Sequence, residues 1–383
     1  MINKKILAGL ANLALLSLLN VCFAATDDQH YSSDDFYKVA KIDMHMHLYS
    51  TNPGFMHEAE HDHFRVLSIN VDYPDFPPLD VQRTVSETML KNYPTRFAYA
   101  ATFSVDNFEQ PGWADAVIRQ IDEAVRHGAV AVKVWKNIGM SLRAADGHFV
   151  MIDDPHFRPI FDHLAKIHIP LLGHQGEPKN CWLPVDQMTV KGDKEYFTAH
   201  PQYYMYLHPE MPSYQDQMQA RDHMLSQHPT LQFAGLHLAS LEWSVDEIAH
   251  FLDRFPNAVV DVAARISQLQ SQSIQDREKV RKFFIKYQDR IMYATDLEQA
   301  ADPVSEQASG APSHKEELSF EEQTRQIWLS DWRYFTSSEI FNVEDLDPPV
   351  QGLSLPKAVI DKIYRKNAEH LFPTAWGQPP TVK

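Results

Sequence analysis

Eight short apolar runs, rich in β-branched and aromatic residues, alternate along the chain with longer segments of helical period. The runs are 39–48, 64–71, 97–103, 129–135, 169–174, 231–238, 258–263 and 291–296. Their near-continuous apolar character predicts strands buried on both faces, as in a parallel sheet covered by helices. Because the chain has no glycine-rich dinucleotide loop, eight such units favour a closed (β/α)8 TIM barrel, and a doubly wound open sheet is the alternative.

Helical periodicity between the runs predicts helices at 81–93, 113–126, 155–166, 214–227, 245–255 and 276–287. Two longer segments lack this pattern, 175–213 after the fifth run and 297–355 after the eighth. In a TIM barrel the loops that follow the strands build the active site. We therefore expect long loops after strands 5 and 8 that form a lid or a substrate pocket.

The first 24 residues combine Lys4 and Lys5 with an apolar run at 6–19 and small residues at their end, which is typical of a cleaved signal peptide. That run is too short to cross a bilayer, and no later stretch reaches the about 18–20 apolar residues that a membrane helix needs. We therefore expect an exported protein, periplasmic or secreted, with no membrane contact after signal cleavage. Residues 25–38 are expected to form a flexible lead-in.

The net charge of the sequence is −16, and it becomes −18 once Lys4 and Lys5 leave with the signal peptide. Such a charge repels phosphate backbones, so nucleic acid is not an expected partner. Cys22 also leaves with the signal peptide, which deprives Cys181 of an intrachain disulfide partner. The expected partner is a small-molecule substrate, and the sequence leaves the oligomeric state open, a homo-oligomer included.

Metal-type ligands stand at the ends of four predicted strands. His45 and His47 are two residues apart, so a strand turns both imidazoles to the same side. His174, His237 and Asp296 end the fifth, sixth and eighth runs. Imidazole and carboxylate suit Zn²⁺ and other borderline divalent ions. Five such residues at one rim of a barrel predict a metal site, although each one alone is more simply explained as a buried or capping residue.

The combined pattern resembles the amidohydrolase superfamily, and within it the amidohydrolase-related metal-dependent hydrolases with a TIM-barrel fold. The similarity covers residues 39–372, including a closing helix at 355–372. The predicted barrel domain is 39–373, which leaves 374–383 as a C-terminal tail. The resemblance implies that His45, His47, His174 and Asp296 hold the principal metal. It implies that His237 binds a second ion or polarises the substrate, and that the cofactor is one or two divalent ions, with Zn²⁺ the first choice.

Lys133 on the fourth run has the parity of an inward-facing residue. By the same resemblance, a carboxylated lysine at this strand bridges two metals in binuclear relatives, whereas mononuclear relatives lack it. An unmodified lysine beside a dication is repelled, so Lys133 is carboxylated, neutral or turned away. The bridging role and a plain substrate-contacting or structural role stay open.

The residues expected to bind substrate lie at or just after strand ends: Trp135, Lys136, Glu177 and Arg265. Packing and ordinary surface charge are equally good explanations for each. A separate motif, His57-Glu58-Ala59-Glu60-His61, matches the HExxH pattern of zinc proteases. Its neighbours are mostly charged and no third-ligand motif follows, so we interpret it as a polar loop near the site entrance.

These residues predict a hydrolase that cleaves a C–N or C–O bond of a small amide, lactone or ester through a metal-activated water. In this hypothesis Asp296 is the general base and acid, and His237 stabilises the oxyanion. The alternative is nonoxidative decarboxylation of a small aromatic or unsaturated carboxylic acid on the same scaffold. A barrel that binds without turnover is disfavoured, because no ligand of the five is missing.

Overall fold

The main sheet is parallel and its strands follow one another in sequence order. The structure is a computed structural model that describes residues 30–301 and 318–377, so the predicted signal peptide lies outside the described residues. Nine strands lie in the order β8-β7-β6-β5-β4-β3-β2-β1-β9. They are β1 Lys41–Leu48, β2 Phe64–Ile69, β3 Phe97–Thr102, β4 Ala131–Val134, β5 Leu171–Gly173, β6 Phe233–Gly235, β7 Ala258–Asp261, β8 Ile291–Met292 and β9 Leu297–Gln299. This order differs from the doubly wound alternative, in which the strand order reverses at a switch point.

The eighth predicted run meets both edges of the curled sheet. The first part of this run is β8, which pairs with β7. Strand β9 begins directly after the run and pairs with β1. Between them the Met44 amide donates to the Tyr293 carbonyl at 3.2 Å, and the Asp296 amide donates to the His45 carbonyl at 2.8 Å. The sheet therefore returns to its first strand, and the expectation of a parallel α/β sheet with a TIM-barrel-like curl is confirmed.

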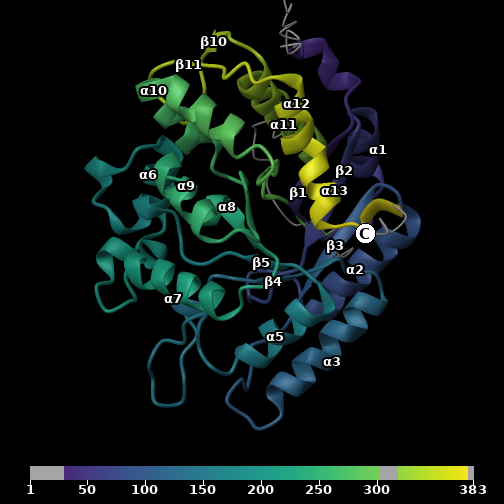
Figure 1. Cartoon of the computed structure of the whole chain (residues 1–383), viewed down its shortest axis with the longest axis vertical. Coiled ribbons are helices and arrows are strands. Elements are labelled where there is room, and N and C mark those ends of the chain that lie inside the picture. The colour runs from purple at the N-terminus through teal and green to yellow at the C-terminus, as the bar shows by residue number, and fades with distance from the viewer. Residues whose placement is uncertain (1–29, 302–317, 378–383) are drawn as a thin grey trace, which may run out of the picture.

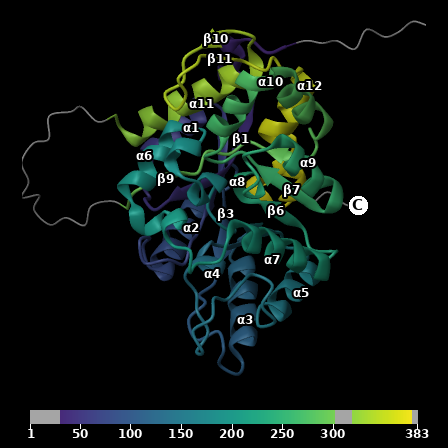
Figure 2. The ribbon, with the colours of Figure 1, turned by 90° about the vertical axis from the view of Figure 1, so that its left-hand side faces the viewer.

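Helices surround the sheet in both views of the molecule (Figures 1 and 2). They are α1 Gly54–His61, α2 Leu79–Asn92, α3 Trp113–Arg126, α4 Asn137–Met140, α5 Arg158–Ile167, α6 Lys191–Ala199, α7 Tyr214–Gln227, α9 Val245–Arg254, α10 Ile266–Lys286, α11 Phe320–Thr336, α12 Lys357–Asp361 and α13 Asn367–Leu371. A short turn, α8 Leu236–Ala239, follows β6, and a small antiparallel pair joins β10 Ile340–Phe341 to β11 Val350–Gln351. None of the described helices combines the length and apolar composition that crossing a membrane requires.

Two apolar clusters show which side chains face inward. The inner cluster takes alternate residues from the strands, among them Ile42, Leu67, Ala98, Leu172 and Met292. It is closed below by residues from the C-terminal segment, including Phe372 and Trp376, whose indole donates to the Val66 carbonyl at 3.0 Å. The outer cluster takes the intervening strand residues and the helix faces packed against them. Strand parity therefore decides which side chains enter the barrel.

The structure corrects several predicted boundaries. The segment 297–355 is not simply a loop, because it contains α11, which begins at a capping box between Ser319 and Glu322. Helix α10 begins at Ile266, ten residues before the predicted start, and has a kink at Asp276. The sixth strand ends at Gly235 rather than at Leu238, because α8 follows immediately.

The expected lead-in is ordered within its described part. Residues Ser33–Tyr37 form a 3-10 turn, and Phe36 is fully buried between the rings of Phe64 and Trp332. The Trp332 indole also donates to the Ser32 carbonyl at 3.1 Å. Apolar side chains thus attach the polar-looking lead-in to α11, and regular structure begins before Tyr37.

Candidate metal centre

A bulge in β1 turns His45 and His47 into the barrel. Opposite β2, the register moves from Asp43↔Val66 to Met46↔Ser68, so β1 has one extra residue at this point. Before the bulge, Ile42 and Met44 belong to the inner cluster, whereas after it Met46 and Leu48 belong to the outer one. Bulges redirect side chains in this way next to functional sites. The extra residue therefore gives the two histidines their inward parity.

The predicted ligands converge around the Asp296 carboxylate. Oδ1 of Asp296 lies 3.0 Å from His45 Nε2 and 3.2 Å from His47 Nε2, and Oδ2 lies 4.0 Å from His237 Nε2. The imidazole rings of His174 and His237 are 4.1 Å apart between centroids, and those of His45 and His237 are 5.0 Å apart. Side chains from four strand ends are thus brought to one place.

Two of these residues have left-handed backbone conformations. In α8 and at its C-cap, φ lies between 56° and 58° for His237, Leu238, Ala239 and Ser240, and Asp296 has φ of 68°. For residues other than glycine each such conformation costs about 1–2 kcal/mol. Without the turn, the alternation that points Ala234 and Leu236 inward would turn His237 outward. The backbone strain is therefore what brings His237 to the other ligands.

Neighbouring groups hold the α8 turn in place. The Ser240 hydroxyl donates to the Gln175 carbonyl at 2.8 Å, and the Tyr214 hydroxyl donates to the Ser240 carbonyl at 2.5 Å. The Arg221 guanidinium donates to the Ala239 carbonyl. These contacts come from the loop after β5 and from α7, so the turn is fixed from two sides.

Three imidazoles anchor one ring nitrogen outward and turn the other toward the centre. Each of His45, His47 and His237 donates its Nδ1–H outward, to Asp261 at 2.9 Å, the Ile69 carbonyl at 2.7 Å and the Ala263 carbonyl at 3.0 Å. The Nε2 atoms of His174 and His237 are buried and have no hydrogen-bond partner. Outward anchoring of one nitrogen is typical of metal-binding histidines, and an orphaned buried nitrogen needs a ligand. This donor set fits a divalent cation.

Burial and charge favour the ligand forms of these groups. Burial lowers the pKa of His174 and of His237 well below its usual value, so both rings are neutral. Burial alone would raise the pKa of Asp296, but His45 and His237 outweigh it and the pKa is well below its usual value. Neutral imidazoles beside an ionised carboxylate are the forms that bind a metal.

Lys133 lies inside the site, on β4. Its Nζ is 3.4 Å from His45 Nε2, and its side chain is buried. Burial lowers the pKa of Lys133 to about 8, while the charges of Asp296 and Asp261 oppose that shift. The amine is thus held close to the pH at which it becomes neutral, a form that can approach a cation.

A cavity of about 430 Å³ lies beside the ligands. Trp135, Lys136 and Glu177 line it, and Lys136 forms an ion pair with Glu177. The Trp135 ring lies 6.4 Å from that of His174. Arg265 is not among the described residues that line the cavity. Burial lowers the pKa of His237, and the charge of Arg265 adds to that shift. The Arg265 Nε is buried and has no hydrogen-bond partner among the described residues.

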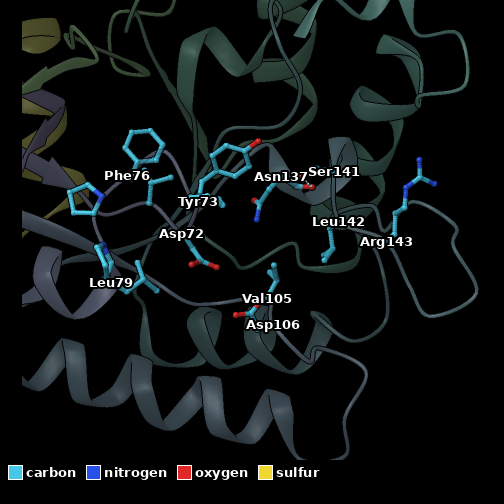
Figure 3. A pocket seen from close by; sticks show the side chains of 14 residues that line it. Asp72, Tyr73, Phe76, Leu79, Val105, Asp106, Asn137, Ser141, Leu142 and Arg143 are labelled. Atoms are coloured by element: carbon cyan, nitrogen blue, oxygen red, sulfur yellow. Dashed lines mark hydrogen bonds between the residues drawn. The ribbon is translucent and has the colours of Figure 1, made fainter. Parts of the chain in front are cut away.

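A second hollow, of about 610 Å³, adjoins the first (Figure 3). The two share Tyr73, Phe76, Asn137 and Ser141. The second adds the carboxylates of Asp72 and Asp106 below Tyr73 and Asn137, as Figure 3 shows. The space beside the ligands is thus extended, and it is lined by aromatic rings and by polar groups.

The HExxH segment is a helix and not the polar loop that we expected. It lies within α1, which buries Phe55, Met56 and Ala59 against β2 and α11. Glu58 and Asp62 lie 3.4 and 3.7 Å from the Arg325 guanidinium of α11. The His61 side chain is 59% exposed and pairs with Asp62. One arginine therefore offsets part of the charge of these two carboxylates, and the His61 ring lies 6.2 Å from that of Tyr37.

Two buried carboxylates near the ligands were not identified from the sequence. Asp261 ends β7 and contacts His45 and His237. Asp43 accepts hydrogen bonds from the Thr295 hydroxyl at 2.7 Å and from the Trp328 indole at 3.0 Å. Asp43 therefore ties β1 to the segment that carries Asp296. The sequence did offer a sign of Asp261, because it stands two residues before Ala263 on the seventh run and so shares its inward face.

A curled parallel sheet that gathers imidazoles and a carboxylate at its strand ends defines the class of metal-site α/β-barrel proteins. The chain belongs to the amidohydrolase family, whose model, described as amidohydrolase, matches residues 42–374. The resemblance inferred from the sequence is thereby confirmed.

One solved structure with a TM-score above 0.5 supports the fold, and two others are reported beside it. An amidohydrolase II is 13% identical with a TM-score of 0.51, covering 87% of this chain and 100% of its own. A 2,6-dihydroxybenzoate decarboxylase from Rhizobium is 16% identical with a TM-score of 0.49, covering 87% and 98%. A 4-oxalomesaconate hydratase from Rhodopseudomonas palustris is 12% identical with a TM-score of 0.44, covering 87% and 95%. A search of curated proteins finds no match.

Proposed function

We propose that this chain is a metal-dependent hydrolase that cleaves a C–N or C–O bond in a small amide, lactone or ester. The observation that carries the proposal is the convergence of His45, His47 and His237 on the Asp296 carboxylate, at 3.0, 3.2 and 4.0 Å. Burial lowers the pKa of His47 and of His237, and uncharged rings beside an ionised carboxylate are arranged for a cation and for proton transfer. The scaffold proposed is a (β/α)8 barrel with the site at the carboxyl ends of its strands.

His45, His47, His174 and Asp296 would hold the ion, and Zn²⁺ is the first choice for this ligand set. When bound, such an ion acidifies water and polarises a carbonyl group. Whether one ion or two are held depends on Lys133. A carboxylated Lys133 would add a bridging ligand for a second ion, whereas an unmodified amine, whose Nζ lies 3.4 Å from His45 Nε2, would leave the site with one ion.

Asp296 is the proposed general base and acid. Its side chain is 28% exposed, the most accessible of the group, so a water molecule in the cavity can reach it. It would accept the proton of the attacking water and return it to the leaving group. His237 donates its Nδ1–H to Ala263, so its Nε2 accepts and does not donate while the ring is neutral. His237 therefore holds an ion or takes a proton, and it stabilises an oxyanion only after protonation.

The proposed substrate occupies the cavity lined by Trp135, Lys136 and Glu177, with Arg265 as an anion contact beside His237. Aromatic rings there offer flat apolar contacts, and the Lys136–Glu177 pair offers both a donor and an acceptor. A small molecule that is both planar and polar fits this lining.

Product analysis in ¹⁸O-labelled water tests the proposal. The zinc-loaded protein is incubated with panels of small amides, lactones, esters and aromatic carboxylic acids. Hydrolysis incorporates one labelled oxygen into the organic product, whereas release of carbon dioxide with no labelled oxygen in the organic product would replace it with the decarboxylase alternative. Asp296→Asn is expected to lower turnover by at least 100-fold. Full turnover of this variant with metal bound would remove Asp296 from the base role, and Asp347→Asn, at an 85% exposed carboxylate, is the control.

We further propose export to the periplasm or the medium, on the signal-like composition of residues 1–24. The net charge of −16 supports a small-molecule partner over nucleic acid. Size-exclusion chromatography with light scattering tests whether the chain forms a homo-oligomer.

A further inference from the structure

The carboxylate of Asp261 touches two of the proposed ligands at once. Asp261 is the last residue of β7, and its side chain is fully buried. Its Oδ2 accepts the Nδ1–H of His45 at 2.9 Å, and its Oδ1 accepts the backbone N–H of His237 at 2.6 Å. One rigid group thus connects a ligand on β1 with the first left-handed residue of α8.

The contact with His45 favours the ring form that can bind an ion. Both ring nitrogens of His45 face carboxylates, Nδ1 at 2.9 Å from Asp261 and Nε2 at 3.0 Å from Asp296. When an ion binds Nε2, the single ring proton lies on Nδ1, where Asp261 accepts it. The other tautomer would place a proton on Nε2, where the ion would bind. Asp261 therefore keeps His45 in the form that ligates.

The bond to His237 satisfies an amide that the sheet cannot use. Pairing between β6 and β7 ends at Gly235↔Val260, and β6 itself ends at Gly235. The amide of His237 is buried beyond that point, where an unpaired N–H costs about 1–3 kcal/mol. Asp261 takes this hydrogen bond and so favours the left-handed turn that faces His237 inward.

We infer that Asp261 is a positioning residue that couples the tautomer of His45 to the backbone turn of His237. The inference rests on the proposed metal-dependent function. It predicts that Asp261 controls metal affinity, although it binds no metal itself and lies behind the ligand rings. Carboxylates that hydrogen-bond to metal-binding histidines in this way change metal affinity by about 10–100-fold.

Asp261→Asn tests this coupling, because it removes one of the two accepting oxygens with almost no change in side-chain volume. Both partners of Asp261 are donors, and an asparagine offers only one accepting oxygen. If its NH2 group faces His45, that ring must move its proton to Nε2 in order to accept. If the NH2 group faces His237 instead, two donors oppose each other and the backbone N–H loses its acceptor. We expect zinc affinity to fall about 10–100-fold, measured by competition with a fluorescent chelator, with the far-ultraviolet circular dichroism spectrum unchanged.

Asp331→Asn is the matched control, because Asp331 is also a buried aspartate, and the one hydrogen bond of its side chain within residues 30–301 and 318–377 comes from the Tyr293 hydroxyl, at 2.8 Å, which asparagine can also accept. It should bind zinc as tightly as the parent chain. Equal zinc affinity in a folded Asp261→Asn variant, or equal losses in both variants, would overturn the inference. A parent chain that binds no zinc would instead overturn the proposed function.

A measurement on the unsubstituted protein covers the case in which the variant does not fold. Long-range ¹H–¹⁵N spectra of the zinc-loaded, ¹⁵N-histidine-labelled chain distinguish protonated from unprotonated ring nitrogens. The His45 Nδ1 should carry a proton. An unprotonated Nδ1 would refute the role assigned to Asp261, whatever reaction the site performs.

Discussion

Replacing Gly235 with alanine should disturb the α8 turn through one steric contact. Gly235 has an ordinary extended conformation, φ −75° and ψ 98°, so alanine is not disfavoured by the backbone. Its added Cβ would lie 2.5 Å from the Cβ and 3.1 Å from the Cα of Ala239, and 3.4 Å from the Phe233 ring. Overpacking of this kind costs about 1–3 kcal/mol. At about 2.1 cal/mol/K per residue, the chain should lose about 1–4 °C in Tm.

The same contact predicts a rescue. Ala239→Gly removes the closest atom and also relieves a left-handed residue at φ 56°. Relief of about 1 kcal/mol is roughly offset by the greater flexibility of glycine in the unfolded chain, so this single change should be near neutral. The double variant Gly235→Ala/Ala239→Gly should recover most of the loss, with a coupling of about 1–2 kcal/mol.

Calorimetry of the zinc-free proteins measures these effects without a contribution from ligand binding. Ala264→Gly is the control, because Ala264 is also left-handed, at φ 51°, but is exposed and is not among the nearest neighbours of a Cβ added at Gly235. Combined with Gly235→Ala it should give additive changes. If Ala239→Gly were equally additive, the steric account of the α8 turn would be refuted.

Two further predictions concern buried ionisable groups. Elemental analysis should find one zinc per chain in both the parent and Lys133→Ala, because an unmodified amine offers no bridging oxygens. Two ions in the parent and one in the variant would establish a carboxylated bridge. Burial raises the pKa of Asp331 to about 8, so the folded chain keeps a proton that the unfolded chain loses near pH 4, and stability should fall as pH rises from about 4 to about 8. Urea denaturation of Asp331→Asn should show a flatter pH dependence across that window, and an equal slope would contradict the assignment.

The strands and most ligands could be predicted from the sequence, because burial on both faces leaves apolar runs that differ from amphipathic helices. His45 and His47 share a face whatever the local register, since they are two residues apart. Which face they share depends on the β1 bulge. The bulge is not visible in the sequence, because Met44 and Met46 are residues that occur equally well in a regular strand. The left-handed turn at His237 is likewise hidden, since no glycine marks residues 236–240.

The missed helices do have signals in the sequence. Helix α11 begins with Ser319 and Glu322 at capping-box spacing. Helix α1 places Phe55, Met56 and Ala59 on one face, and this pattern lies partly ahead of the charged HExxH residues that suggested a loop. The Asp261 contact could not be predicted, because it depends on how two non-neighbouring strand ends meet in space.

The floor of the barrel is built from residues late in the chain. Phe372 and Trp376 cover the inner cluster. Strand β9, which completes the pairing with β1, also lies late in the chain, at residues 297–299. The inner side chains of the earlier strands therefore stay uncovered until the segment that carries Phe372 and Trp376 is in place, wherever the chain folds. A chain truncated at about residue 360 should yield aggregates rather than a smaller folded barrel.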